Sequence, residues 1–389
     1  MEIKMRTLPM LMSIPILSLA LVGCSDSSNR EIVDILVPEV PSESQPKFDF
    51  SAVDQRLQQF LDESAVFDGI SVTLVDKTQG MVHEAAFGDH TLDTIVMLAS
   101  TSKVPTVSLL MALNDDESLD FDIQSTIDNY LPWDGVYGDR TSVHLVSNTA
   151  GIPGLAGLGD YGPSLCQFSF DVPLLECAEI LYANEIKGTM PPATGFSYGG
   201  TQWQLAGAVV EQVSNSTFNQ AFDEYIAQPC GLEVFEYGNP WSDLESWNGS
   251  PDSLIGRINA HSEGGAITNL SDYAKILMMH LNGGMCGDTQ VMAESSVAFM
   301  QVDRGGEFGT PYGMGWWITL DEEGGAPTIF TDPGAFGAIS WLDIERGIGG
   351  YVAIDDYTRV DSGAPIALVQ GEIIQMVADA VDAARAAVN

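Results

Sequence analysis

Strand-forming segments lie near both ends of this chain, and a long region of helices and loops separates them. Residues 69–76 alternate between apolar and polar side chains, and a turn at 77–80 joins them to a second strand pattern at 81–87. Strand patterns return only late in the chain, at 312–318, 338–342 and 350–354. This order predicts an α+β fold in which distant segments complete one antiparallel sheet flanked by helices, with a mostly helical lobe at about 104–305.

Apolar residues at helical spacing mark the main helices. The chain has 389 residues, of which 45% are hydrophobic, so it can bury a substantial core in one large domain or two smaller ones. No internal repeat is visible, and we assign a single domain to residues 51–389. The helices that we expect span 51–65, 202–213, 270–281 and about 366–387, in addition to one that begins near residue 100.

The first residues have the composition of a targeting segment. Lys4 and Arg6 precede an apolar run at 8–23 that is too short to span a membrane well as a helix. The sequence Leu-Val-Gly-Cys ending at Cys24 resembles the lipobox of bacterial lipoproteins. The resemblance implies a signal peptide at 1–23, a lipidated Cys24 and a flexible linker to residue 50 that is rich in serine, proline and acidic residues. The alternative is an ordinary secretory signal, and both readings predict export.

Export makes disulfides possible. Besides Cys24 the chain has four cysteines, at 166, 177, 230 and 286, which allow three pairings. The short separation favours Cys166–Cys177, which leaves Cys230–Cys286. No CxxC or Cys/His cluster indicates a metal site, and we expect each of the five histidines to be structural (His83, His90, His144, His261 and His280).

The charge balance excludes one class of partner. The chain has 15 lysines and arginines against 54 aspartates and glutamates, a net charge of −39. Such an acidic surface repels nucleic acid, so we expect no nucleic-acid partner. Solubility in a salty setting explains the charge better than a dedicated cationic partner does.

The sequence Ser-Thr-Ser-Lys at 100–103 places a lysine three residues after a serine. On a helix the two side chains lie on one face, so the amine of Lys103 can reach the hydroxyl of Ser100. A serine needs a base to become a nucleophile, and a lysine shielded from water can lose its proton near neutral pH. The alternative is an N-cap serine near a surface lysine. Pro105 requires the helix to begin near Ser100 or Ser102, where proline costs least.

Several blocks of sequence, in order, resemble the serine β-lactamase and penicillin-binding protein superfamily. The resemblance covers about residues 52–388 and is greatest to the class C β-lactamase and family VIII esterase branch. It implies the β-lactamase-like fold. The blocks are 99–103, 119–122 with 130–132, 144–153, 196–200 with 205–207, and 312–316.

The resemblance also implies roles for particular residues. Ser100 would form an acyl-enzyme, Lys103 would accept or relay its proton, and Tyr198 would be the general base or acid. A nearby lysine must depress the pKa of such a tyrosine. The backbone N–H groups of Ser100 and Ala335 would form the oxyanion hole, and no cofactor is implied.

Two motifs depart from the family pattern. Gly200 replaces the asparagine of the Tyr-x-Asn motif, whose amide contacts the acyl side chain of the substrate. Asp332 replaces the lysine or histidine that precedes Gly334, and an acid there would repel an anionic substrate such as a β-lactam. Gly334 would still let a substrate lie along the strand. We assign Gly200, Asp332 and Gly334 to substrate binding.

A second possible nucleophile is Ser197, in the G-x-S-x-G pattern at 195–199. That pattern requires a preceding strand, and the prolines at 191 and 192 disfavour one. The alternating strands and helices of an α/β-hydrolase are also absent from the sequence pattern.

The sequence therefore predicts an exported, lipid-anchored and monomeric serine hydrolase that cleaves small esters or amides, with an esterase favoured. A β-lactamase comes second and a D-amino acid peptidase third. A hypothesis of another class is a non-catalytic domain that binds the cell wall or a partner, and the presence of Ser100, Lys103 and Tyr198 argues against it.

Overall fold

A computed structural model of the chain describes residues 45–154, 162–319, 327–357 and 363–388. From Gln45 onward the chain forms one compact unit. The predicted signal peptide, the predicted lipid site at Cys24 and most of the predicted linker lie outside the described residues.

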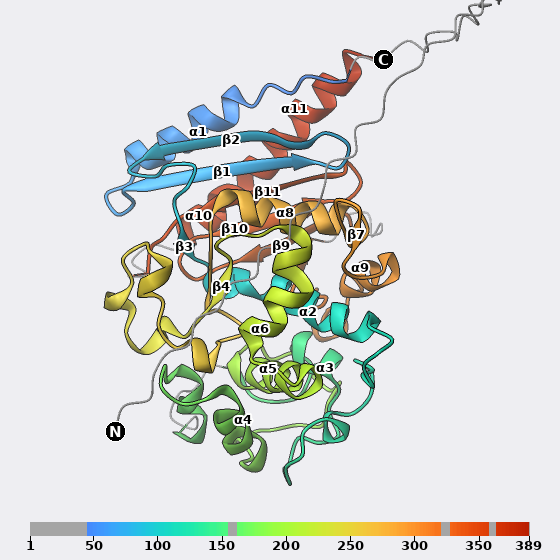
Figure 1. Cartoon of the computed structure of the whole chain (residues 1–389). Helices are drawn as coiled ribbons and strands as arrows, with labels where there is room; N and C mark the ends of the chain where they lie inside the picture. The colour runs from blue at the N-terminus through green and yellow to red at the C-terminus, as the bar shows by residue number, and fades with distance from the viewer. Residues whose placement is uncertain (1–44, 155–161, 320–326, 358–362, 389) are drawn as a thin grey trace, which may run out of the picture. The chain divides into compact units, whose positions relative to one another are not determined.

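The main sheet has six strands in the order β2-β1-β11-β10-β9-β8, and every neighbouring pair is antiparallel (Figure 1). Strands from the beginning of the domain pair directly with strands from its end, since Thr73 of β1 lies opposite Tyr351 of β11. This confirms the predicted antiparallel sheet built from distant segments. The strands are β1 Gly69–Asp76, β2 Gly80–Gly88, β8 Trp317–Thr319, β9 Ile329–Pro333, β10 Ile339–Asp343 and β11 Ile348–Ala353.

The strand prediction for 312–318 was mostly wrong, and β9 was not predicted. Only the last residues of that segment join β8, because the chain turns at Gly313, whose N–H donates to Trp316 O over 2.8 Å. Gly315 has φ +84° and packs against the backbone of Val104. A conformation of this kind favours glycine and does not fit a regular strand.

One face of the sheet is covered by the first and last helices of the domain. Helix α1 (Ser51–Glu63) packs there with the continuous run formed by α10 (Gly363–Leu368), η11 (Val369–Ile373) and α11 (Ile374–Ala386). The run 363–386 is long and apolar enough to cross a membrane, but its apolar side chains, such as Val377 and Val381, are buried against the sheet. Packing in the core therefore explains its composition.

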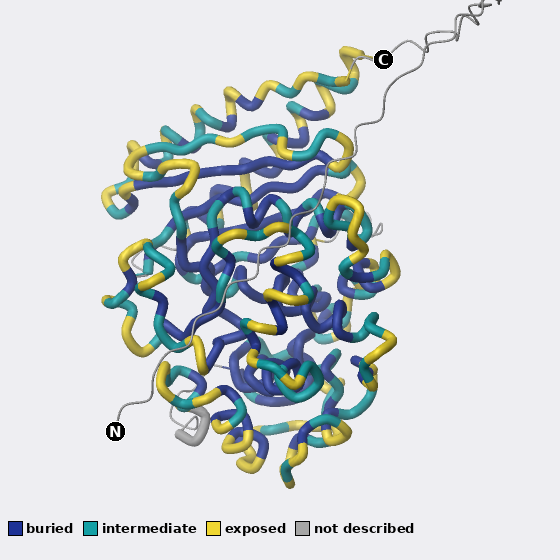
Figure 2. Tube along the Cα trace, in the orientation of Figure 1, coloured by how far each residue is buried: buried dark blue, intermediate teal, exposed yellow. Residues whose placement is uncertain are grey.

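The other face packs on the helical lobe, in which α2 (Lys103–Asp115) is central. Nearly every residue of α2 is buried, as expected for a helix that is apolar on all sides (Figure 2). Helix α8 (Leu270–Leu281) lies between the sheet and the lobe, and its Tyr273 stacks on Tyr351 with ring centroids 4.3 Å apart. The other α-helices of the lobe are α3 Ser142–Val146, α4 Leu174–Ala183, α5 Gly200–Ser214, α6 Phe218–Phe222, α7 Gln228–Cys230 and α9 Glu294–Met300.

The structure pairs the cysteines as predicted. Cys166, in the 3₁₀-helix η4 (Gly162–Phe168), is bonded to Cys177 of α4, and Cys230 at the end of α7 is bonded to Cys286 of β6 (Met285–Cys286). Strand β6 forms a two-stranded ribbon with β7 (Thr289–Gln290). Both bridges lie in the helical lobe.

A small three-stranded sheet in the order β3-β5-β4 positions the site. Strand β3 (Val96–Met97) pairs antiparallel with β5 (Ala266–Thr268), which also pairs with β4 (Glu236–Tyr237). Because β3 and β5 run in opposite directions, the residues after β3 lie beside the residues before β5. Segment 99–103 therefore meets segment 261–265.

Candidate active site

Ser100 lies in a short 3₁₀-helix, η1 (Ala99–Ser102), that continues directly into α2. Ala99 is fully buried with φ +47°, a strained conformation for a residue with a side chain. The Ser102 hydroxyl donates to Ala99 O over 2.7 Å and accepts the N–H of Ala266 over 3.1 Å, which fixes the turn. Pro105 lies in the first turn of α2, as predicted.

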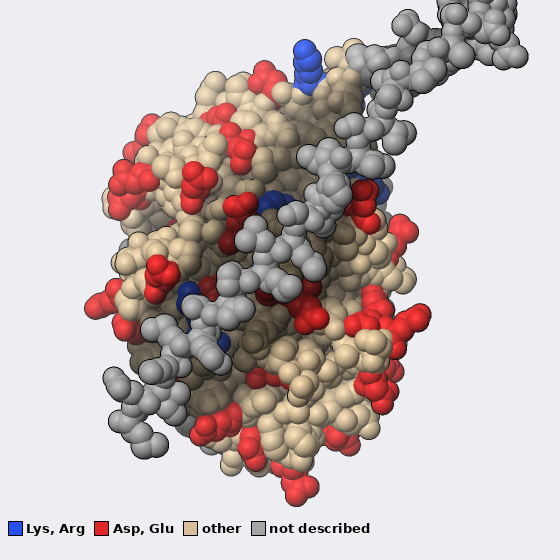
Figure 3. Space-filling view, viewed as in Figure 1, with Lys and Arg blue, Asp and Glu red and all other residues tan. Residues whose placement is uncertain are grey.

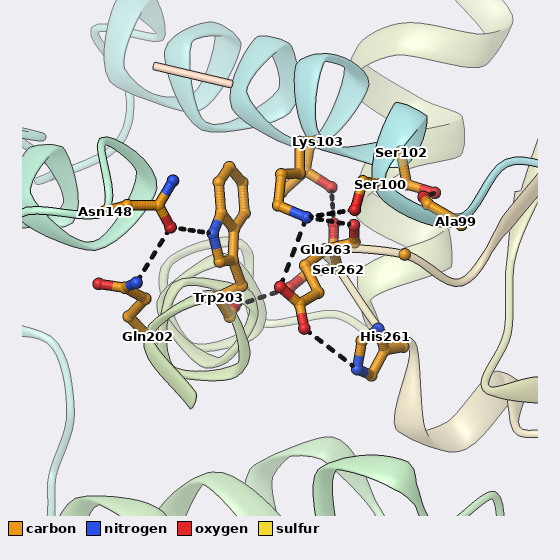
Figure 4. A network of polar contacts seen from close by, with 12 residues as sticks. Ala99, Ser100, Ser102, Lys103, Asn148, Gln202, Trp203, His261, Ser262 and Glu263 are labelled. Carbon is orange, nitrogen blue, oxygen red and sulfur yellow. Dashed lines mark hydrogen bonds and ion pairs between the residues drawn. The ribbon is translucent and has the colours of Figure 1, made fainter. Parts of the chain in front are cut away.

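The structure brings Lys103 to Ser100. The side chain of Lys103 is 1% exposed, and its Nζ donates to Ser100 Oγ over 3.1 Å and to the backbone oxygen of Glu263 over 2.9 Å (Figure 4). Nζ also lies 3.4 Å from Oε2 of the same glutamate. The predicted contact between the serine and the lysine is therefore present.

Tyr198 joins this pair from the loop before α5. Lys103 Nζ lies 4.6 Å from the centre of the tyrosine ring, and the tyrosine hydroxyl interacts with both Lys103 and Ser100. The loop is held against the segment after α3, where the carbonyl of Asn148 accepts the N–H of Ser197 over 2.9 Å. Ser100 and Lys103 come from one segment and Tyr198 from another, and the structure brings the three together, as the sequence predicted.

The protonation of the pair differs from the sequence-based expectation. Burial alone would lower the pKa of Lys103, but the negative charges that Tyr198, Glu263 and Asp332 can carry outweigh it and raise the pKa above its usual value. Burial also raises the pKa of Tyr198, although Lys103 acts in the opposite direction. In the free protein Lys103 therefore keeps its proton, and the expectation that both pKa values are depressed was wrong. The acidic neighbours of the lysine, which the motif does not reveal, explain the difference.

Asp332 does not have the position that we predicted. It lies in β9 with a fully buried side chain, and its Oδ2 accepts the backbone N–H of Val104, in the first turn of α2, over 3.2 Å. Burial raises the pKa of this carboxyl well above its usual range, although Lys103 acts in the opposite direction. Because the carboxyl faces the helix rather than solvent, the assignment of Asp332 as a substrate-contacting residue was wrong.

Gly334 is required for a reason other than the predicted one. A Cβ at this position would lie 2.1 Å from Leu98 O and 2.8 Å from Thr101 Oγ1. The Thr101 hydroxyl binds the carbonyls of Asp332 and Ala338, at 2.9 Å and 3.1 Å. Gly334 therefore lets the turn after β9 pack directly on the nucleophile turn.

Ala335 follows at the mouth of this turn and is half-buried. Two hydrogen bonds close the turn, from Gly334 N–H to Ala338 O over 2.7 Å and from Gly337 N–H to Gly334 O over 2.9 Å. Neither uses the N–H of Ala335. Its pairing with the N–H of Ser100 as an oxyanion hole stays a prediction.

Glu263 is the site residue that sequence reasoning missed. Its side chain is 7% exposed, and its Oε1 lies 3.7 Å from Nε2 of His261 (Figure 4). Burial lowers the pKa of His261 to about 4, so this histidine is neutral at pH 7. No motif includes Glu263, and its position follows only from the pairing of β3 with β5.

Ser197, the alternative nucleophile, has a structural role. Its Oγ accepts the backbone N–H of Gly154 over 2.6 Å, and its carbonyl accepts Nε2 of Gln202 over 2.6 Å. A Cβ on Gly154 would lie 1.9 Å from Tyr198 O, so the two segments touch. Ser197 therefore fixes the loop that carries Tyr198.

Four aromatic rings border the site, and we call them the aromatic group: Phe196, Tyr198, Tyr312 and Trp317. The ring centroids of Tyr198 and Trp317 are 5.3 Å apart, and those of Phe196 and Tyr312 are 5.5 Å apart. Phe196, Tyr198 and Trp317 are partly exposed. The group can therefore offer an apolar contact to a bound molecule. Among the residues that the structure describes, no group of three His, Cys, Asp or Glu side chains could hold a metal ion.

Comparison with known proteins defines the family. Residues 53–369 match the sequence family named Beta-lactamase, which covers most of the chain. The chain therefore belongs to the β-lactamase family, in agreement with its fold and with the Ser100–Lys103 pair.

Individual relatives are distant. A curated relative, penicillin-binding protein 4 of Amycolatopsis lactamdurans, is 24% identical over 304 residues, which cover 72% of this chain and 77% of the relative. The crystal structure of a putative β-lactamase from Bacteroides dorei has a TM-score of 0.67 and 24% identity, and it covers 85% of this chain and 99% of its own. EstCE1, a hydrolase with promiscuous acyltransferase activity, has a TM-score of 0.66 and 16% identity over 85% of this chain and 98% of its own. Such likenesses show a shared fold.

Proposed function

We propose that this protein is a serine hydrolase that cleaves small carboxylic esters through an acyl-enzyme on Ser100. The observation that carries the proposal is the 3.1 Å contact between Lys103 Nζ and Ser100 Oγ, with the hydroxyl of Tyr198 against both. An N-cap serine near a surface lysine would not give this arrangement, because the lysine is buried.

In the first half of the reaction, Tyr198 in its ionised form takes the proton of Ser100 as Oγ attacks the ester carbonyl carbon. The adjacent Lys103 ammonium stabilises this phenolate and orients the serine. The tetrahedral oxyanion receives the backbone N–H groups of Ser100 and Ala335. When it collapses, the alcohol leaves with the proton that Tyr198 had taken.

In the second half, water replaces the alcohol. Tyr198 removes a proton from the water as its oxygen attacks the acyl carbon, and then returns that proton to Ser100 Oγ as the acid departs. The same two backbone N–H groups stabilise the second oxyanion. Lys103 keeps its charge throughout, in keeping with its raised pKa.

The surroundings of the site support an uncharged or cationic substrate. The aromatic group favours an apolar acyl or alcohol portion, and Glu263 balances the charge of Lys103. A β-lactam or a cell-wall peptide carries a carboxylate that needs a cation, and the position of the third family motif holds a buried acid, Asp332, instead. Acidic side chains are scattered over the visible face of the molecule, with few basic ones (Figure 3).

We also propose that the protein is exported and works as a monomer. The two disulfides fit an oxidising compartment, and the lipoprotein-like start of the chain would hold the enzyme at a membrane surface through Cys24.

Labelling of the full chain with a fluorophosphonate probe, followed by peptide mass spectrometry, tests the proposal. We expect an adduct on Ser100 and none in Ser100→Ala. Nitrophenyl esters should turn over faster than a chromogenic cephalosporin. An adduct on Ser197 would contradict the mechanism, a persistent benzylpenicillin adduct on Ser100 would favour a penicillin-binding protein, and no adduct at all would favour a binding domain.

A further inference from the structure

Lys103 contacts Glu263 through both the backbone and the side chain of the glutamate. The lysine Nζ binds both the backbone oxygen of Glu263, at 2.9 Å, and its carboxylate, at 3.4 Å. Both side chains are almost fully buried, with 1% and 7% exposed. Burying an ion pair costs the desolvation free energy of both charged groups. A contribution to the stability of the fold therefore does not explain why this pair is buried. The pair lies one contact away from the nucleophile, since the same Nζ binds Ser100 Oγ.

The carboxylate of Glu263 lies in space that Gly200 leaves open. A Cβ at position 200 would lie 2.5 Å from Glu263 Oε1 and 2.0 Å from Gln167 Oε1. Any side chain at position 200 would therefore displace the carboxylate. This is the position at which the family pattern has asparagine. Gly200 and Glu263 thus form a matched pair, because the glycine has no side chain and its place is taken by the carboxylate of Glu263.

Several other titratable groups face the Lys103–Glu263 pair, and each comes from a different element. They are Tyr198 from the loop before α5, His261 from the loop before β5, Asp332 from β9 and Tyr312 from the segment before β8. His261 is neutral because burial lowers its pKa to about 4, and burial raises the pKa values of Asp332 and Tyr312 well above their usual ranges. Glu263 carries the carboxylate that lies within ion-pair distance of Lys103 Nζ, at 3.4 Å.

The geometry points to Glu263 as a positioning residue for acyl transfer, seated in the space left by Gly200. It holds the Lys103 ammonium against Ser100 and keeps it charged, so that Tyr198 rather than Lys103 exchanges the proton of the serine. No covalent step passes through Glu263. This inference rests on the proposed function, since it concerns the activation of Ser100.

The rate at which a fluorophosphonate probe labels Ser100, measured from pH 6 to 11, tests the inference in the full chain. In Glu263→Gln the amide keeps the size of the side chain but removes its charge. We expect the maximum rate to fall by about tenfold or more, because a charge-assisted contact is lost. Removal of a neighbouring negative charge also lowers the pKa of Lys103, so the fall in rate at alkaline pH should begin about 1 unit or more lower.

Glu372→Gln is the matched control. Glu372 also pairs with a cation, Arg56 at 2.7 Å, but on the face of the sheet that α1 and α11 cover. The same chemical change there should leave the labelling rate and its pH profile unchanged. A fall in thermal stability alone, with the wild-type pH profile for Glu263→Gln, would mean that Glu263 is only structural and would overturn the inference.

Gly200→Ala provides a second, independent variant. Its new Cβ displaces the ends of two flexible side chains and no backbone, so the fold should tolerate it. We expect slower labelling with the same alkaline shift as in Glu263→Gln. If Gly200→Ala acts through the carboxylate, the double variant will be no slower than Glu263→Gln. If the double variant instead labels more slowly than Glu263→Gln, by the product of the two single effects, then Gly200→Ala acts through Gln167. That result would contradict the matched pair.

The two hypotheses fail in different ways. If the wild-type chain takes no label on Ser100, the proposed function fails, and the inference fails with it. If the wild-type chain is labelled on Ser100 and Glu263→Gln behaves like it at every pH, only the inference fails.

Discussion

Two carboxyl groups approach Lys103 from different segments of the chain, and they serve opposite purposes. Glu263, before β5, lies 3.4 Å from the lysine Nζ and forms an ion pair with it. Asp332, in β9, accepts the backbone N–H of Val104, and burial raises its pKa well above the usual range. The two acids differ in the donor that each one meets. Glu263 meets the ammonium of Lys103 and so acts on the nucleophile, whereas Asp332 meets a backbone N–H of α2 and so fixes the helix.

Lys103 is the group on which both carboxyl groups act, so its removal has the largest expected effect. Lys103→Ala should lower kcat/KM for a nitrophenyl ester by about a hundredfold or more, because it removes the cation that stabilises the Tyr198 phenolate. Tyr198→Phe should lower it to a similar extent, because it removes the base that takes the proton of Ser100. Circular dichroism and thermal melting would control for folding. Near-wild-type kcat/KM values in both variants would contradict the proposed mechanism.

The pH dependence of the same assay sharpens this prediction. Tyr198 must lose its proton to act as a base, and burial raises its pKa, so the active form is scarce at neutral pH. Wild-type kcat/KM should therefore rise from pH 7 to pH 10, and the rise should be absent in Tyr198→Phe. A flat wild-type profile over that range would mean that another group takes the proton.

On the Asp332 side, the packing of Gly334 predicts the next largest effect. A methyl group at this position would meet the backbone oxygen of Leu98 at 2.1 Å, and backbone cannot give way as a side chain can. Gly334→Ala should lower the free energy of unfolding by about 1–3 kcal/mol and reduce activity. Gly371→Ala is the control, because a Cβ there meets nothing within 4 Å. Equal stability of the two variants in urea would contradict the packing that we describe.

Asp332→Asn should have the smallest effect, and we expect it in the stability of the fold rather than in the labelling rate. A carboxyl whose pKa is raised by folding contributes stability at low pH and loses it as pH rises through the folded pKa. The amide has no such loss, so Asp332→Asn should gain stability relative to wild type as the pH rises from 4 to 8. Urea unfolding at both pH values measures this. A variant that becomes relatively less stable as pH rises would mean that Asp332 is ionised.

The sequence predicted those parts of the structure that depend on local pattern. The strands at 69–76 and 350–354, the helix at 270–281 and the pairing of Ser100 with Lys103 all follow from spacing along the chain, and the structure confirms them. Strand β9 was missed, since it is a short run that ends in proline and shows no clear alternation.

The chemistry of the site was harder to predict because it depends on contacts between distant segments. Asp332 attracted attention through its place in a motif, yet only the fold shows that its carboxyl faces α2. Glu263 belongs to no motif, and the pairing of β3 with β5 is what brings it to Lys103. The one sequence signal for it was indirect, since Gly200 leaves a space that some other side chain has to fill.

The pairing of β1 with β11 has a consequence for the order of events during synthesis. A ribosome finishes β1 early, but its neighbour at the centre of the sheet is among the last segments to be made. Until then Ile70, Val72 and Leu74 lack both β11 and the cover of α11. Contacts between segments so far apart form slowly, so the nascent chain stays open through most of translation. This face of β1 is therefore covered only once the last helix of the domain is in place.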